Sequence, residues 1–138
     1  MNKTLTGLLL SAGLLAGCQT QPQQPVDWPQ LTIGPKARGY LQIEAVPQGI
    51  ASGNLLRAGV RLYNRSQSEQ TLRYRFSWTD ANGFELPGMA SRWEQRILRP
   101  GEPVSLDRVA PGPAATAYRI YLFDINTGTA THTQGIER

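Results

Sequence analysis

The chain has 138 residues, of which 40% are hydrophobic and 17% charged, so it suits one folded domain and is neither a disordered chain nor an integral membrane protein. Its formal net charge is +4, but it contains neither clustered lysines nor a recognisable nucleic-acid-binding module, so no nucleic acid partner is expected. The 14 glycines and 10 prolines favour turns and short strands over long helices.

The first segment, residues 1–17, is typical of a lipoprotein signal peptide. It starts with a positive charge at Lys3 and continues with an apolar stretch that is too short to span a membrane, since a span needs roughly 20 apolar residues. It ends in LAGC, the pattern of a bacterial lipobox. We therefore expect cleavage before Cys18, a diacylglyceryl group on its thiol and an acyl chain on its new amino terminus. The alternative is a plain signal peptide in which Cys18 is incidental.

Residues 18–30 are rich in glutamine and proline and predict a semi-extended tether between the lipid and the domain. Two or three acyl chains hold a protein stably at a membrane, so Cys18 is expected to serve as the anchor. Gln19 follows the cysteine in place of the aspartate that resembles an inner-membrane retention signal. This favours the outer membrane, with the domain facing the periplasm. Apart from these covalent lipids, no cofactor is expected.

From Leu31 onward, apolar residues alternate with a period of two, which predicts strands. The two clearest strands cover residues 55–64 and 71–80, and the polar link between them is expected to close an antiparallel hairpin. We predict an all-β fold, a single antiparallel β-sandwich of about seven strands with an immunoglobulin-like layout, over residues 31–126. Residues 127–138 are expected to form a polar C-terminal tail. The other predicted strands are residues 40–46, 84–86, 92–98, 104–109 and 117–124, with 31–34 as a lead-in.

The sequence offers little for catalysis, and the protein is expected not to be an enzyme. The single histidine, His132, lies in the polar tail, and one histidine with one cysteine cannot complete a zinc site. Asp80 and Asp124 follow strand ends, where aspartate commonly accepts hydrogen bonds from a turn. A glycosidase-like pair of these two carboxylates is the minority alternative. No catalytic or metal-binding residue is predicted.

Two tryptophans raise the question of carbohydrate binding, because indole rings stack on sugar faces. Trp78 shares its strand face with three other large apolar side chains, so we expect it in the core. Trp93 lies in a strand of uncertain register and stays open to either interpretation. A third, Trp28, lies in the tether.

If the two clearest strands pair as a hairpin, their outward faces and that of the last strand present arginines beside aromatic rings. Both residue types are enriched at interfaces, and guanidinium groups match carboxylate and phosphate oxygens. The alternative is an ordinary solvated sheet face on which arginine stems cover the aromatic rings. The candidate interaction surface consists of Arg57, Arg61, Tyr63, Arg73, Arg75, Arg119, Tyr121 and Phe123.

The stretch AGVRLYNRSQSEQTLRYRFSWTDANGFEL, followed by LRPGEPVSLDRVAP and YRIYL, resembles the YcfL family of bacterial lipoproteins. The resemblance runs from about Leu55 to Phe123, and the lipobox agrees with it. It implies a periplasm-facing lipoprotein with one β-sandwich and no assigned biochemical activity, and it hints at envelope biogenesis. It supplies no catalytic residues.

We therefore expect a non-enzymatic lipoprotein, anchored in the outer membrane, that acts as an interaction or adaptor module in cell-envelope biogenesis or maintenance. Its expected partners are the membrane, through the lipid anchor, and a periplasmic protein or peptidoglycan. The alternative is a ligand-binding lipoprotein that holds a glycan, peptidoglycan or a lipid on the arginine and aromatic face.

Overall fold

A computed structural model of the chain describes Gly17 and residues 27–126. This part is almost entirely β-structure, as predicted, and adds one short helix, α1 (Pro35–Tyr40), and one 3-10 turn, η1 (Met89–Ser91). The strands are β1 (Leu31–Ile33), β2 (Leu41–Ala45), β3 (Gln48–Ala51), β4 (Leu55–Asn64), β5 (Gln70–Thr79), β6 (Glu94–Leu98), β7 (Val104–Val109) and β8 (Ala117–Asp124).

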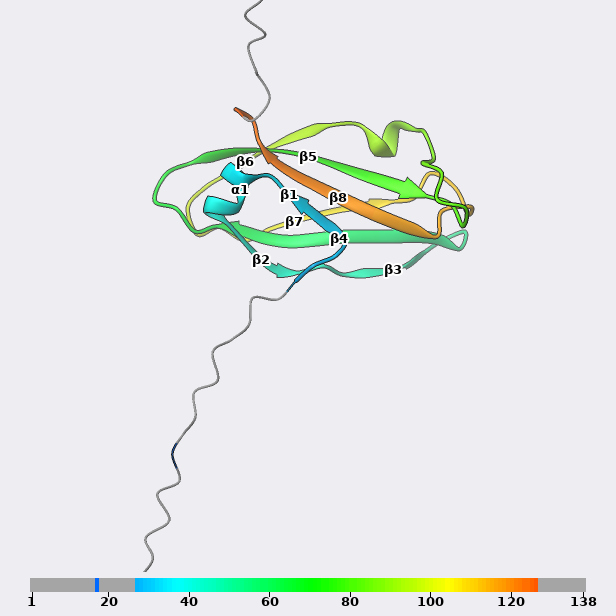
Figure 1. Cartoon of the computed structure of the whole chain (residues 1–138), viewed down its shortest axis with the longest axis horizontal. Helices are drawn as coiled ribbons and strands as arrows, with labels where there is room; N and C mark the ends of the chain where they lie inside the picture. The colour runs from blue at the N-terminus through cyan, green and yellow to red at the C-terminus, as the bar shows by residue number, and fades with distance from the viewer. Residues whose placement is uncertain (1–16, 18–26, 127–138) are drawn as a thin grey trace, which may run out of the picture.

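The strands form two sheets that lie one above the other, so the predicted β-sandwich is confirmed (Figure 1). Sheet A has the order β1-β8-β5-β6. In sheet B, β4 pairs with β2 and β3 along one edge and with β7 along the other. These pairs are antiparallel except β1–β8, which is parallel. The eight strands are one more than the predicted seven.

The predicted hairpin between the two longest strands is wrong, because β4 belongs to sheet B and β5 to sheet A. The link between them crosses from one layer to the other around the side chain of Asn64, which is fully buried. Its Nδ2 donates to the carbonyl oxygens of Ser68 (2.7 Å) and Leu98 (3.0 Å), and its Oδ1 accepts from the backbone N–H of Ser66 (2.9 Å). The link therefore ends in a different sheet from the one in which it begins, and β4 and β5 form no ladder with each other.

Three shorter segments differ from the prediction. Helix α1 begins at Pro35, whose fixed φ suits the first helical position, but its six residues are too few to show helical periodicity. Strand β3 contains Gly49 and Ile50 in a sequence without clear alternation. Residues 84–86 form only an isolated antiparallel bridge, Glu85 with Thr79, in place of a strand. The turn before it is made by the Asp80 side chain, which accepts the N–H groups of Asn82 (2.9 Å) and Phe84 (3.0 Å).

The core lies between the two sheets and is formed by the inward side chains of β4, β5, β7 and β8. Trp78 is 0% exposed, which confirms its predicted place in the core. Its ring stacks on Phe76 with centroids 6.2 Å apart, and the Tyr118 ring packs against it at 6.1 Å. Burial of such large rings supplies about 1.5–3 kcal/mol each and positions the outward residues of the same strands.

Candidate functional site

The predicted interaction surface is divided between the two outer faces of the sandwich. Its first three members, on β4, point outward from sheet B, whereas the members on β5 and β8 point outward from sheet A. Because the core lies between the sheets, these groups face opposite directions and cannot form one surface. The prediction of one surface failed because it rested on the β4–β5 hairpin. The two groups are Arg57, Arg61 and Tyr63, and Arg73, Arg75, Arg119, Tyr121 and Phe123.

The outer face of sheet A gathers aromatic rings and guanidinium groups. In the ladder between β5 and β8, Arg75 is opposite Tyr121 and Arg73 is opposite Phe123, so these side chains are cross-strand neighbours. Trp93, immediately before β6, contacts both rings, with centroid distances of 6.2 Å to Tyr121 and 5.9 Å to Phe123. We call these five residues the aromatic–arginine face.

Two guanidinium groups lie against the same indole ring. The Cζ atom of Arg73 is 4.4 Å from the Trp93 centroid, and that of Arg75 is 5.6 Å from it and 5.1 Å from the Tyr121 centroid. Arg75 also forms an ion pair with Glu85 at 3.2 Å. Among the described residues, Arg73 has no carboxylate within ion-pair distance. Its guanidinium is therefore held in place but retains its hydrogen-bonding capacity for a carboxylate or phosphate oxygen.

Trp93 is the member of this face that sequence reasoning left undecided. Trp93, Gln95 and Ile97 point outward, but the first two inward residues, Glu94 and Arg96, are charged, so hydrophobic alternation could not assign the register. In the structure Trp93 is 40% exposed and Ile97 is 58% exposed. Arg119 lies at the β1 edge of the same sheet, where its Nη1 donates to the Thr32 hydroxyl at 3.2 Å.

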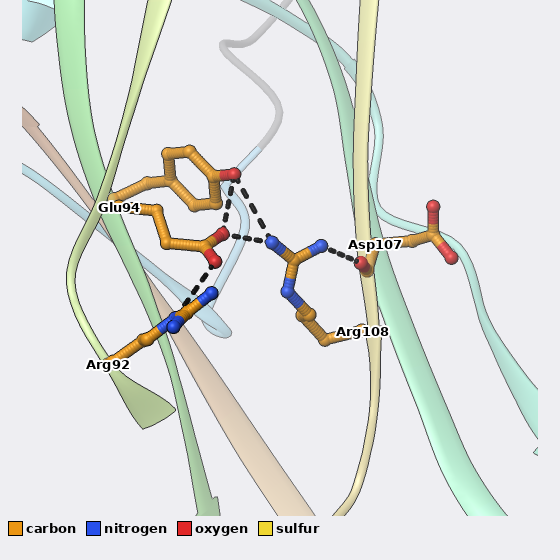
Figure 2. Close-up of polar contacts among 5 residues, drawn as sticks. Arg92, Glu94, Asp107 and Arg108 are labelled. Atoms are coloured by element: carbon orange, nitrogen blue, oxygen red, sulfur yellow. Dashed lines mark hydrogen bonds and ion pairs between the residues drawn. The ribbon is translucent and has the colours of Figure 1, made fainter. Parts of the chain in front are cut away.

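A polar cluster joins the two sheets where β6 of sheet A faces β7 of sheet B (Figure 2). The Tyr74 hydroxyl donates to Glu94 Oε2 at 2.8 Å, and Arg108 forms an ion pair with the same oxygen. Arg92 Nε donates to Glu94 Oε1 at 3.3 Å. The Tyr74 hydrogen bond is the main cause that lowers the pKa of Glu94, and the arginines act in the same direction against the opposing effect of burial.

This cluster is suited to holding β6 against β7 rather than to proton transfer. Both oxygens of Glu94 accept from donors, and its lowered pKa favours the charged form. A general acid at neutral pH needs the opposite, a raised carboxyl pKa. Burial, together with the bond to Glu94, raises the pKa of Tyr74, so its hydroxyl stays protonated and continues to donate.

The two aspartates considered as a catalytic pair lie at opposite ends of sheet A. Asp124 is opposite Leu72 in the ladder, whereas Asp80 follows Thr79, the other end of β5. Eight residues of strand separate these positions by roughly 26 Å, well beyond the spacing of glycosidase carboxylates. The alternative of an Asp80–Asp124 pair is therefore wrong. Asp80 accepts turn hydrogen bonds, and Asp124 forms an ion pair with Lys36 at 2.9 Å.

Some predictions concern residues that the structure does not describe. Cys18 and His132 lie outside the described residues, so lipidation stays a prediction. Within residues 27–126, no group of three or more histidine, cysteine or acidic side chains could hold a metal ion. No helix in the described part is long and apolar enough to cross a membrane.

Comparison with known proteins decides the family. The model of a family described as a protein of unknown function, DUF1425, matches residues 23–124. The chain belongs to the DUF1425 family. Its similarity to the uncharacterized protein YcfL of Escherichia coli K12, 33% identical over 88 residues, covers 62% of this chain and 70% of that protein. The resemblance to the YcfL family is thereby confirmed.

Two solved structures share the fold of this DUF1425 protein. A DUF1425 member from a Shewanella species is 24% identical with a TM-score of 0.54, and the match covers 59% of this chain and 75% of the other. Campylobacter jejuni cj0090 is 21% identical with a TM-score of 0.58, covering 69% of this chain and 97% of the other. At sequence identities this low, the similarity shows a shared fold only.

Proposed function

We propose that this DUF1425 protein is a non-enzymatic, lipid-anchored interaction module of the bacterial cell envelope that binds an acidic protein surface through its aromatic–arginine face. The observation that carries the proposal is the stacking of Arg73 and Arg75 on Trp93, with Arg73 lacking a carboxylate partner among the described residues. Arginine and tryptophan are the residue types that most often dominate interface energies.

The stacking prepares Arg73 for binding. A free arginine side chain loses roughly 0.5–1.5 kcal/mol of conformational entropy when an interface immobilises it. Arg73 already rests on the indole, so part of this loss is incurred before a partner arrives. The neighbouring Ile97 adds exposed apolar surface, and the positive charge selects for aspartate and glutamate on the partner.

The same geometry argues against the alternative in which Trp93 stacks on a sugar. One face of the indole lies 4.4 Å from the Arg73 guanidinium carbon, and the Phe123 ring meets it edge-on at 5.9 Å. A sugar ring stacked on the indole face that Arg73 covers would have to displace its guanidinium. A carboxylate on a protein surface can accept hydrogen bonds from the guanidinium in its present position.

Cys18 would hold this module at the outer membrane, facing the periplasm. The support is the LAGC pattern after a short apolar segment and the glutamine at position 19. A Cys18→Ser variant is expected to remain unprocessed and to incorporate no labelled palmitate, whereas normal labelling would contradict the anchor. Residues 18–30 would then separate the lipid from β1.

Photo-crosslinking in cells tests the proposed face. A photoreactive amino acid replaces Gln95, which is exposed and opposite Arg73 in the β5–β6 ladder, and mass spectrometry identifies the crosslinked peptide. We expect a discrete protein adduct at an acidic segment, lost in Arg73→Glu and retained in Arg61→Glu, the matched charge reversal on the opposite face. An adduct insensitive to Arg73→Glu would overturn the proposal.

Binding to isolated peptidoglycan tests the glycan-binding alternative. Retention of the protein on sacculi that disappears with Arg73→Glu, in the absence of any protein adduct, would replace the adaptor function with the glycan-binding alternative. Thermal melting of both arginine variants checks that each remains folded.

A further inference from the structure

The outer face of sheet B, opposite the aromatic–arginine face, contains a hollow of about 410 Å³. It lies over β3, β4 and β7 and is bordered by Pro47 in the link between β2 and β3. Its volume falls within the range of small-molecule sites, about 300–1,000 Å³. It is separate from the proposed protein-binding face, so the two sites can be tested independently.

Two glycines on neighbouring strands line this hollow. Gly59 occupies the outward position between Arg57 and Arg61 on β4, and β7 approaches so closely that an added Cβ would lie 3.0 Å from the Leu106 carbonyl oxygen. On β3, an added Cβ at Gly49 would meet no atom within 4 Å, so the space above it is open. Gly59 thus lets β7 pack closely against β4, and the lack of a side chain at Gly49 leaves open space beside them.

The charges around the hollow do not cancel. At one end, Arg57 Nε (3.0 Å) and Nη2 (2.6 Å) both donate to Oδ2 of Asp107. At the other end, Arg61 is exposed and makes no ion pair with any described residue, and Ser105 stands opposite it in the ladder. One uncompensated positive charge with a hydroxyl beside it favours an anion.

The remaining lining groups narrow the chemistry of that anion. Oδ1 of Asp107 accepts no hydrogen bond from the described residues, so it suits a ligand O–H or N–H donor. Asp107 and Ser105 are two strand residues apart, roughly 7 Å, which is too long for a single acetate-sized group to bridge. Pro47 and Ile50, the latter 66% exposed, offer apolar contact at the side.

We infer that this hollow binds a small ligand in which a carboxylate lies a few bonds from a hydroxyl or amide donor. The carboxylate pairs with Arg61 and Ser105, and the donor bonds to Oδ1 of Asp107. Inorganic phosphate fits less well, because it is too short to reach both ends. Two kinds of molecule carry the required chemistry, namely sugar acids and the C-terminal end of a short acylated peptide.

Saturation-transfer NMR on the full chain in detergent tests this inference with glucuronate and N-acetylalanine as probes. Glucose and N-acetylalanine amide, which lack the carboxylate, are the matched neutral controls. Arg61→Gln is expected to weaken binding about tenfold or more, the loss expected for one charge-assisted contact. Gly49→Val, which fills open space without touching Arg61, should weaken it similarly, and Arg73→Gln on the opposite face should leave it unchanged.

The binding results distinguish the two kinds of ligand. Binding of glucuronate alone identifies a sugar-acid site, and binding of N-acetylalanine alone identifies a peptide-terminus site. Binding of both supports the shared chemistry. Failure of both acids to bind, equal binding of the neutral controls, or binding that survives both Arg61→Gln and Gly49→Val would overturn the inference.

Discussion

The ring of Phe123 lies so close to Gly34 that a Cβ added to the glycine would be 2.6 Å from Cδ1 of the ring. The backbone brings the two together, since the N–H of Gly34 donates to the carbonyl oxygen of Leu122 at 2.9 Å. The same ring meets Trp93 in a T-shaped arrangement with centroids 5.9 Å apart. Gly34 therefore helps to position one wall of the aromatic–arginine face.

Gly34→Ala is expected to lower the free energy of unfolding by about 1–3 kcal/mol, because the methyl group has to displace the Phe123 ring. The effect is steric, since Gly34 has φ −64° and ψ 153°, which alanine adopts freely. Gly39→Ala in α1 is the matched control, because an added Cβ there meets nothing within 4 Å. It should stabilise the protein by up to about 1 kcal/mol. Urea unfolding measures both, and equal midpoints would refute the close contact.

Asn64 is expected to be among the most sensitive polar residues, because it is fully buried and its amide holds the crossing between the sheets. Asn64→Ala leaves the Leu98 carbonyl and the Ser66 N–H without their partner, and a loss of about 2–4 kcal/mol in unfolding free energy should follow. Asn82→Ala, at an exposed turn position, should change stability by less than about 0.5 kcal/mol. A loss below 1 kcal/mol for Asn64→Ala would mean that other contacts hold this crossing.

The local alternation of apolar and polar residues predicts where the strands lie but not which strands pair. Residues 55–64, 104–109 and 117–124 match the strand bounds of the structure, because period-two alternation is a property of each segment alone. The crossing of the β4–β5 link depends on Asn64 reaching Leu98, 34 residues away, which no local pattern reveals. The wrongly predicted β4–β5 pairing placed on one surface the arginines that the structure divides between two faces.

Local sequence patterns likewise could not predict the position of Trp93 or the presence of the hollow. The inward side of β6 begins with a charged residue, Glu94, which reaches Arg108 of the other sheet, so hydrophobicity misrepresents which side faces inward. The hollow is bordered by β7, which approaches Gly59 closely, and a glycine in the sequence does not reveal which strand will approach it. Both sites depend on contacts between segments distant in the chain.

The Glu94 cluster should make stability sensitive to acid. Because the pKa of Glu94 is lower in the folded protein, its contribution is complete above the ordinary glutamate value of about 4.3 and is lost as the pH falls through the folded pKa. At pH 7, Glu94→Gln should reduce the unfolding free energy by about 1–3 kcal/mol, since Arg108 loses its charged partner. This difference from the wild type should shrink as the pH falls below about 4.

Arg92→Gln is the control for this cluster, because Arg92 is the exposed partner of Glu94 at 3.3 Å and should contribute less than about 0.5 kcal/mol. Denaturant unfolding at several pH values measures all three proteins. A difference between wild type and Glu94→Gln that stays constant from neutral to acidic pH would show that the carboxylate charge is not what the cluster uses.

The ion pair of Lys36 with Asp124 should be the main electrostatic link between α1 and β8. Asp124 is 1% exposed, and its carboxylate accepts from Lys36 Nζ (2.9 Å) and from the N–H of Asn126 (2.9 Å). Burial alone would raise the pKa of Asp124, but these donors outweigh it and the pKa lies below the ordinary value. The carboxylate is therefore charged at neutral pH, and its contribution is lost as the pH falls through the folded pKa.

Lys36→Met removes the cation and leaves a buried carboxylate, which should cost about 1–3 kcal/mol at pH 7, less than for a fully buried pair because Lys36 is half exposed. Adding Asp124→Asn should recover part of this loss, since the amide needs no cation. Arg38→Met, on the exposed side of the same helix, is the matched control and should be near neutral. Recovery in the double variant distinguishes an unpaired charge from lost packing of the lysine stem, because packing loss would persist after Asp124→Asn.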